Sequence, residues 1–291
     1  MSTDLTSAVL TYDPHPATPA LTLPAGACDC HVHVFGPSAR FPYDGARTLT
    51  PVDAPKEALF ALHRTLGMER CLIVQSVIHG LDNRVVEDAI AAGGGRYLGV
   101  ALVSTDVPDA ELRRLAAAGI RGVRFNFLKP QDLDAVDAVL ALTRRLEPLG
   151  LHLQVHFESS LVHALAAPLA RSAVPVVIDH MGRVNAALGA GHADFQALLA
   201  LLRNPSFRVK VSGIDRVDAA PPYAHGKALA RLLVERHPEQ CLWGTDWPHP
   251  FHNHVPSDAA LVEALAEIAP TPALREQILV LNPERFYRFA A

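Results

Sequence analysis

Short apolar runs alternate with amphipathic segments along most of the chain. The runs are apolar at consecutive positions rather than at every second one, which is typical of strands covered on both faces. Eight of them predict strands at residues 28–35, 70–76, 97–103, 122–127, 152–157, 175–181, 207–213 and 241–247. Apolar residues at helical spacing predict helices between them, for example at residues 56–66, 110–118, 135–146, 195–202 and 228–236.

Eight strands that alternate with helices predict an α/β fold, a (β/α)8 barrel of the TIM type. A doubly wound sheet would carry a glycine-rich phosphate turn after an early strand, but the one glycine cluster, residues 93–95, precedes a predicted strand. Residues 1–26 are rich in Pro, Thr and Ala and show no period, so we expect an N-terminal arm on the surface. Residues 27–291 are expected to form one barrel that ends with a closing helix after residue 270.

Composition narrows the class of protein. Of the 291 residues, 49% are hydrophobic and 19% charged, which excludes disorder for the bulk of the chain. The formal net charge is −4 and no basic run is present, so we expect no nucleic-acid partner. No segment has the pattern of a signal peptide or the length of a membrane span, which predicts a cytoplasmic protein, as a monomer or a homo-oligomer. The four cysteines lie in apolar runs without a C-x-x-C pair, and we expect buried thiols.

Polar residues collect at the C-terminal ends of the predicted strands, where a barrel of this type opens. The first strand carries His31 and His33, which share a face because side chains alternate along a strand. The fifth and sixth strands contribute His156 and His180, and the eighth contributes Asp246. A lone histidine at such a position is more often structural, but five groups at one end of one barrel predict a functional site.

Several segments carry a resemblance that extends from about residue 27 to residue 287. In these segments the chain resembles the amidohydrolase superfamily, in its branch of pyrone-dicarboxylate lactonases and related lactone hydrolases. The segments are residues 29–37, 79–84, 122–127, 179–183, 210–212, 243–250 and 282–283.

The resemblance implies a hydrolase that acts on a carboxylic ester bond and opens a lactone. The expected substrate is a small anionic molecule, such as a 2-pyrone-4,6-dicarboxylate-like or muconolactone-type intermediate of aromatic-compound catabolism. Asp246 is suited to accept a proton from water as the general base. His31, His33 and His180 can polarise the carbonyl and stabilise the oxyanion, directly or through a metal.

Candidate substrate-binding residues are cationic or lie in the shared segments. Arg124 ends the fourth predicted strand and Arg216 follows the seventh, and guanidinium groups match carboxylates in geometry. An ion pair within the protein is the alternative for each. The shared segments add His79, Asn83 and Arg183, and capping of the next helix is the alternative for Asn83.

Three positions depart from the branch that the chain resembles. Leu49 and His156 stand where the branch has Tyr, and Pro130 stands where it has Arg. A pocket built for two carboxylates would lose polar contacts through these changes. We therefore expect a substrate with fewer or differently placed anionic groups.

The histidine at position 156 also bears on metal binding. His31, His33, His156 and Asp246 together form a set of imidazole and carboxylate ligands suited to one divalent Zn or Mn ion. We expect one such ion, with metal-independent catalysis as the alternative. Asp29 is expected either to support the two neighbouring histidines from behind or to have a plain capping role.

Alternative functions fit the same pattern. Within the superfamily these are a sugar-acid lactonase or lactone isomerase and a metal-dependent decarboxylase. Outside enzymes, the alternative is a barrel that only binds a small molecule. Residues 79–84 and 243–250 favour a lactonase, and the presence of Asp246 beside the histidine pair argues against a binder without activity.

Overall fold

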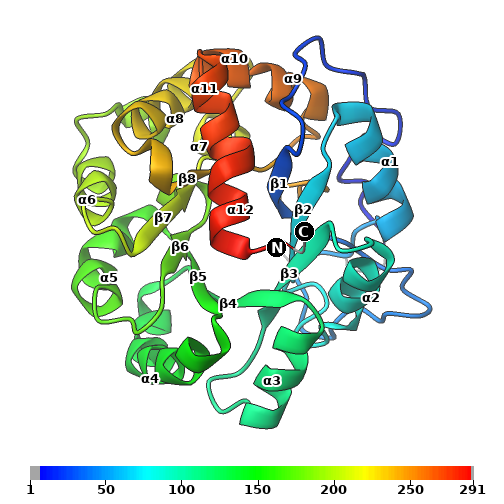
Figure 1. The fold of residues 1–291 in the computed structure, drawn as a ribbon, viewed down its shortest axis with the longest axis vertical. Helices are drawn as coiled ribbons and strands as arrows, with labels where there is room; N and C mark the ends of the chain where they lie inside the picture. The colour runs from blue at the N-terminus through cyan, green and yellow to red at the C-terminus, as the bar shows by residue number, and fades with distance from the viewer. Residues whose placement is uncertain (1–6, 290–291) are drawn as a thin grey trace.

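Eight parallel strands form one sheet in the computed structural model, which describes residues 7–289. The strands follow one another in the sheet in the same order as along the chain, with helical segments between them (Figure 1). Beyond β8 the sheet closes on β1, because the N–H of Cys30 donates to the carbonyl of Trp243 at 2.8 Å. The predicted TIM-type barrel is confirmed. Its strands are β1 (Cys28–Val32), β2 (Arg70–Val74), β3 (Tyr97–Leu102), β4 (Ile120–Phe127), β5 (His152–Phe157), β6 (Val176–Ile178), β7 (Phe207–Lys210) and β8 (Cys241–Leu242).

Helices surround the barrel and bury their apolar faces against the outer side of the strands (Figure 1). The prediction for residues 56–66 coincides with α1, and α2 and α5 occupy two of the intervals between strands for which helices were expected without stated bounds. The helices are α1 (Lys56–Leu66), α2 (Arg84–Ala92), α3 (Asp109–Ala117), α4 (Val136–Leu146), α5 (Val162–Leu169), α6 (Ala193–Leu201), α7 (Ile214–Val217), α8 (Ala224–Arg236), α9 (Asp258–Glu263), α10 (Leu265–Ile268), α11 (Pro272–Glu276) and α12 (Asn282–Tyr287).

Several strands are shorter than predicted at the C-terminal end, and β6 also begins one residue later than predicted. The eighth was expected over residues 241–247, but β8 ends at Leu242. Beyond it the chain no longer forms a regular strand, although the backbone of Trp243, Asp246 and Trp247 still bonds to β1 and the residue after it, and Asp246 adopts a left-handed backbone with φ of 69°. The apolar run continues past the strand because Trp243 and Trp247 are buried in the hydrophobic core around the barrel.

The N-terminal end of the barrel is closed by α12, which crosses it in Figure 1. Tyr287 is fully buried there and packs against residues that point into the barrel from β1, β2, β3, β6 and β8. Arg208, near the start of β7, stacks its guanidinium on the ring of Phe286, with 4.5 Å from Cζ to the ring centre. The predicted closing helix is therefore present, in continuation of α11 and a π-helical turn over Gln277–Leu281.

A register shift in β1 decides which way its side chains point. The pairing with β2 slips between Asp29 and Val32, so one residue is left over. Cys28 and Cys30 lie in the cluster inside the barrel, whereas Val32 lies in the outer core. His31 follows Cys30 and still faces the barrel mouth, which strict alternation would not allow.

Residues 7–26 run along the barrel surface; residues 1–6 of the predicted arm, and 290–291 at the other end, lie outside the described part of the chain. Val9 forms an isolated bridge with Pro51, and the ring of Tyr12 packs edge-on against Trp247 with 5.1 Å between centres. All four cysteines are free and buried, as expected. Across residues 7–289, none of the helices combines the length and apolar character that a membrane crossing requires.

The buried side chain of His152 makes the stability of the fold depend on pH. Burial and the charge of Lys210 lower the pKa of His152 to about 3. An unfolded histidine titrates near 6.5, so the unfolded chain binds more protons between these values and the free energy of unfolding decreases as the pH falls from 7 to 5. We expect His152→Gln to weaken this slope by up to about 1.4 kcal/mol per pH unit in urea denaturation. The exposed control His225→Gln should keep the wild-type slope, and an unchanged slope in His152→Gln would refute the assignment.

Candidate active site

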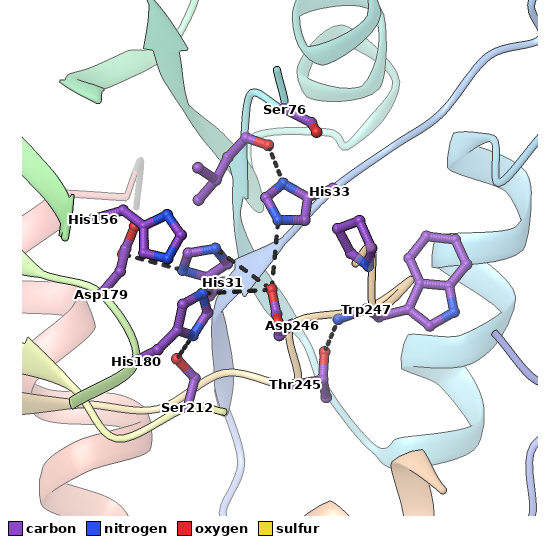
Figure 2. Close-up of polar contacts among 12 residues, drawn as sticks. His31, His33, Ser76, His156, Asp179, His180, Ser212, Thr245, Asp246 and Trp247 are labelled. Carbon is purple, nitrogen blue, oxygen red and sulfur yellow. Dashed lines mark hydrogen bonds and ion pairs between the residues drawn. The ribbon is translucent and has the colours of Figure 1, made fainter. Parts of the chain in front are cut away.

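Three imidazoles direct their Nε2 atoms at one oxygen of Asp246 (Figure 2). The distances from Asp246 Oδ1 are 3.7 Å to His31, 3.4 Å to His33 and 3.7 Å to His180. All four side chains are buried. They come from β1 and from the segments after β6 and β8, so the structure brings together the four residues that the sequence suggested for catalysis.

Left-handed backbone conformations hold two of these side chains in place. His180 has φ of 47° and Asp246 has φ of 69°. Six of the eight non-glycine residues with positive φ in the described chain lie in these two loops, and such residues concentrate at functional sites. Nearby, Gly244 cannot be replaced without a shift, because a Cβ there would lie 2.5 Å from the backbone nitrogen of His31.

The other ring nitrogen of each imidazole has its own partner. His33 Nδ1 lies 2.7 Å from the carbonyl of Val74, so it donates a proton and leaves the Nε2 lone pair toward Asp246. His180 Nδ1 lies 3.0 Å from Ser212 Oγ. These contacts fix the ring planes, and for His33 they fix the tautomer.

Below the site, the centre of the barrel is charged. Asp179 Oδ1 lies 3.3 Å from His31 Nδ1 and 3.6 Å from Lys210 Nζ. Its other oxygen accepts hydrogen bonds from Arg124 Nε at 2.8 Å and Gln154 Nε2 at 3.1 Å. The histidine and aspartate pattern at the strand ends did not single out Asp179 or Lys210. The sequence feature that could have identified them is a charged residue inside an otherwise apolar strand segment.

The surroundings of the site keep its carboxylate ionised and its imidazoles neutral. Burial alone would raise the pKa of Asp246, but the Arg216 charge and the neighbouring imidazoles hold it well below its usual range. Burial and the Lys210 charge lower the pKa of His31 to about 3, despite the opposing effect of Asp179. Burial likewise places the pKa of His180 well below 6.5. At neutral pH the site therefore holds an ionised Asp246 beside the neutral imidazoles of His31 and His180, which is the protonation state of metal ligands.

The donor atoms also have the spacing that a metal needs. Those of His31, His33 and Asp246 all lie within 4.8 Å of one another. Adjacent ligands of a tetrahedral ion with bonds of about 2.1 Å lie about 3.4 Å apart, close to the 3.4 and 3.7 Å between Asp246 and the two histidines. His31 Nε2 and Asp246 Oδ1 are buried without a hydrogen-bond partner. The residues present therefore fit a divalent ion.

His156 lies at the edge of this arrangement. Its ring centre is 5.6 Å from that of His180, and its Nδ1 is 3.2 Å from Asn126 Oδ1. Its Nε2 is buried without a hydrogen-bond partner, and burial lowers the pKa well below 6.5. Among residues 7–289, however, the compact ligand groups do not include His156.

Three of the expected substrate-binding residues already make hydrogen bonds or ion pairs within the protein. Arg216 donates from Nε to Asp246 and from Nη2 to the carbonyl of Pro250 at 2.8 Å, and Arg124 is paired with Asp179. The two ring nitrogens of His79 lie 3.2 Å from the N–H of Gly36 and from the carbonyl of Pro42.

The remaining two candidates differ from each other. Asn83 exchanges hydrogen bonds with the backbone of Leu102, from which it accepts at 3.0 Å and to which it donates at 2.9 Å, and it stands directly before α2. Arg183 has a half-exposed side chain whose nearest acid is Glu158, at 3.5 Å. Of these five residues, Arg183 has the side chain most accessible to a ligand.

Asp29 connects the backbone of β1 to the backbone of the segment after β8, and it does not support the imidazole rings of His31 and His33. It accepts hydrogen bonds from the backbone N–H groups of His31 and Thr245, both at 3.1 Å, and from Thr245 Oγ1 at 2.6 Å. It therefore fixes the backbone of the segment that carries Asp246 against β1, which corresponds to the capping alternative.

Comparisons with known proteins identify the family of the chain. The amidohydrolase family model matches residues 28–289, and the chain belongs to this family. A 2-pyrone-4,6-dicarboxylate hydrolase of Comamonas testosteroni is 40% identical over 285 residues, which cover 94% of this chain and 93% of the relative. A 4-sulfomuconolactone hydrolase of Hydrogenophaga intermedia is 37% identical over 271 residues, with 91% and 89% covered.

A solved structure shares the architecture. It is a candidate 2-pyrone-4,6-dicarboxylic acid hydrolase of Acinetobacter baumannii with citric acid bound. It superposes with a TM-score of 0.82 at 27% sequence identity, covering 91% of this chain and 100% of the other.

Asp29 provides a test of how the barrel closure supports the site. In Asp29→Ala, Thr245 loses acceptors for two buried donors, and we expect the free energy of unfolding to decrease by about 2–4 kcal/mol. Urea denaturation measures this loss. Asp29→Asn, which keeps an acceptor oxygen, should lose less. A loss below about 1 kcal/mol in the alanine variant would contradict a clamping role.

Proposed function

We propose that the protein is a lactonase that hydrolyses the cyclic ester of a small anionic molecule. The observation that carries this proposal is the buried Asp246 carboxylate facing three imidazole Nε2 atoms at 3.4–3.7 Å. The names of the two relatives described above, hydrolases of a pyrone dicarboxylate and of a sulfomuconolactone, support the same reaction type.

Asp246 acts as the general base in this proposal. Water adds its oxygen to the lactone carbonyl carbon and gives one proton to the Asp246 carboxylate. The tetrahedral intermediate then breaks the ring C–O bond, and the proton passes to the leaving oxygen. The low pKa of Asp246 keeps it ionised at neutral pH, and Arg216 and the imidazoles hold it in position.

The imidazoles and a metal would supply the electrophilic part. His31, His33 and Asp246 would hold a divalent ion, and we propose His156 as a further ligand on the strength of its unpartnered Nε2. Such an ion, when bound, would polarise the carbonyl and lower the pKa of water. His180 is then left to orient the substrate or to stabilise the oxyanion, with Ser212 fixing its ring.

The substrate is proposed to carry anionic groups. Arg183 and Arg216 line a cavity of about 300 Å³, and Arg124 lines a separate hollow of about 380 Å³. The N-terminal arm supports the segment that carries the base, because Tyr12 packs on Trp247, the residue after Asp246.

Turnover of anionic lactones tests the reaction. We expect hydrolysis of at least one member of a panel of pyrone carboxylates, muconolactones and aldonolactones, with one water added to the product. Asp246→Asn should lower kcat/KM by at least about 10³-fold, because the base is lost while the shape is kept. Asp137→Asn, on an exposed side chain of α4, is the matched control.

Near-normal turnover in Asp246→Asn would exclude Asp246 as the base. Release of carbon dioxide, or an isomer without added water, would replace hydrolysis by another reaction.

Metal binding at His156 has its own test. Protein purified without chelator should contain zinc or manganese by elemental analysis. If His156 is a ligand, His156→Gln should weaken zinc binding about 10- to 100-fold in competition with a chromophoric chelator. The control His163→Gln changes a half-exposed histidine of α5. Equal affinity in His156→Gln and wild type would remove His156 from the ligand set.

A further inference from the structure

A second group of histidine and aspartate side chains lies beside the site, outside the ligand set described above. Asp215 belongs to α7, and His249 and His252 lie in the segment after β8. Their side chains are at most 3% exposed. One donor atom from each lies within 4.8 Å of the others.

These side chains are buried without the hydrogen bonds that burial requires. Both carboxylate oxygens of Asp215, Nδ1 of His249 and Nε2 of His252 lack a hydrogen-bond partner. His252 Nδ1 is 3.0 Å from Asp215 Oδ2, yet the two are not aligned as a hydrogen bond. Buried polar atoms without partners are costly, so a group that satisfies several of them at once would be strongly favoured.

The second nitrogen of His249 is oriented as in metal sites. His249 Nε2 lies 3.0 Å from Asp258 Oδ1, and the Asp258 side chain is fully buried. A carboxylate behind a histidine fixes the ring and makes the other nitrogen a better ligand. Here that other nitrogen is Nδ1, which is unpartnered and shares the cluster with Asp215 and His252.

The charges around the cluster favour a cation. Asp258 contacts His249, and Asp246 Oδ2 lies 3.5 Å from His252 Nε2, so these two carboxylates adjoin the cluster in addition to Asp215. The guanidinium of Arg216 is already paired with Asp246.

We propose that Asp215, His249 and His252 bind a second divalent transition-metal ion beside the Asp246 site. Two imidazoles and one carboxylate are the donor set of Zn²⁺ and of neighbouring first-row ions. A route from solvent exists, because Asp215 and His252 line the same cavity of about 300 Å³ as Arg183 and Arg216. The site does not depend on the lactonase proposal, since it is defined by its own ligands.

Counting bound Zn²⁺ in variants of the full chain tests this site. Protein freed of metal with a chelator is dialysed against Zn²⁺, and the bound ion is measured by elemental analysis. We expect two equivalents in wild type and one in His31→Asn/His33→Asn, which lacks two ligands of the Asp246 site. Adding Asp215→Asn to that double variant should leave none. Co²⁺ should give a visible absorption band in the double variant and none in the triple variant.

Stability measurements separate loss of the site from loss of the fold. Zn²⁺ should raise the Tm of the double variant and leave that of the triple variant unchanged. His252→Gln in the double background is a second removal, and His225→Gln there, on an exposed imidazole of α8, is the control that should keep one equivalent. The proposal is overturned if the folded double variant binds no Zn²⁺, or if Asp215→Asn and His252→Gln leave its stoichiometry unchanged. One equivalent in wild type that survives His31→Asn/His33→Asn but is lost with Asp215→Asn would support this site and refute a metal at Asp246.

Discussion

The buried carboxylate of Asp246 is the group on which the arrangement of the site depends. An ionised carboxylate removed from water costs several kcal/mol unless it is paired. One oxygen of Asp246 contacts Arg216 and His252, and the other faces His31, His33 and His180. These partners can reach it only because the loops after β6 and β8 adopt left-handed conformations and β1 shifts its register. Local strain and the position of the proposed base therefore have the same origin.

The barrel interior has two levels with different chemistry. The lower level is apolar and is closed by Tyr287 of α12, whereas the upper level contains Asp179 with Lys210 and Arg124. Burial would raise the pKa of Asp179, but His31, Arg124 and Lys210 bring it well below its usual value. Burial and the Lys210 charge together outweigh the effect of Asp179, so His31 stays neutral and its Nε2 lone pair remains available at the mouth. The upper level thus controls the protonation state of the site without reaching its surface.

The sequence predicts the fold and the main site residues because both leave a local signal. Polar residues that interrupt apolar strand runs identify His31, His180 and Asp246, and the alternation of strands and helices identifies the barrel. The register shift leaves no such signal, since residues 28–33 alternate in sequence as a regular strand would. The partnership of Asp179 with Lys210 joins β6 to β7 across the interior, so it emerges only when the strands are assembled.

The number of arginines near the site overestimates the positive charge that is available to a substrate. Arg124 neutralises Asp179 and Arg216 neutralises Asp246, so each acts first on a carboxylate of the protein. An ion pair has little net charge at a distance, which leaves Arg183 as the less engaged cation of the three. Leu49, which packs against the core, adds no polar contact. These contacts support our expectation of a substrate with fewer or differently placed anionic groups, rather than one whose two carboxylates both require a free guanidinium.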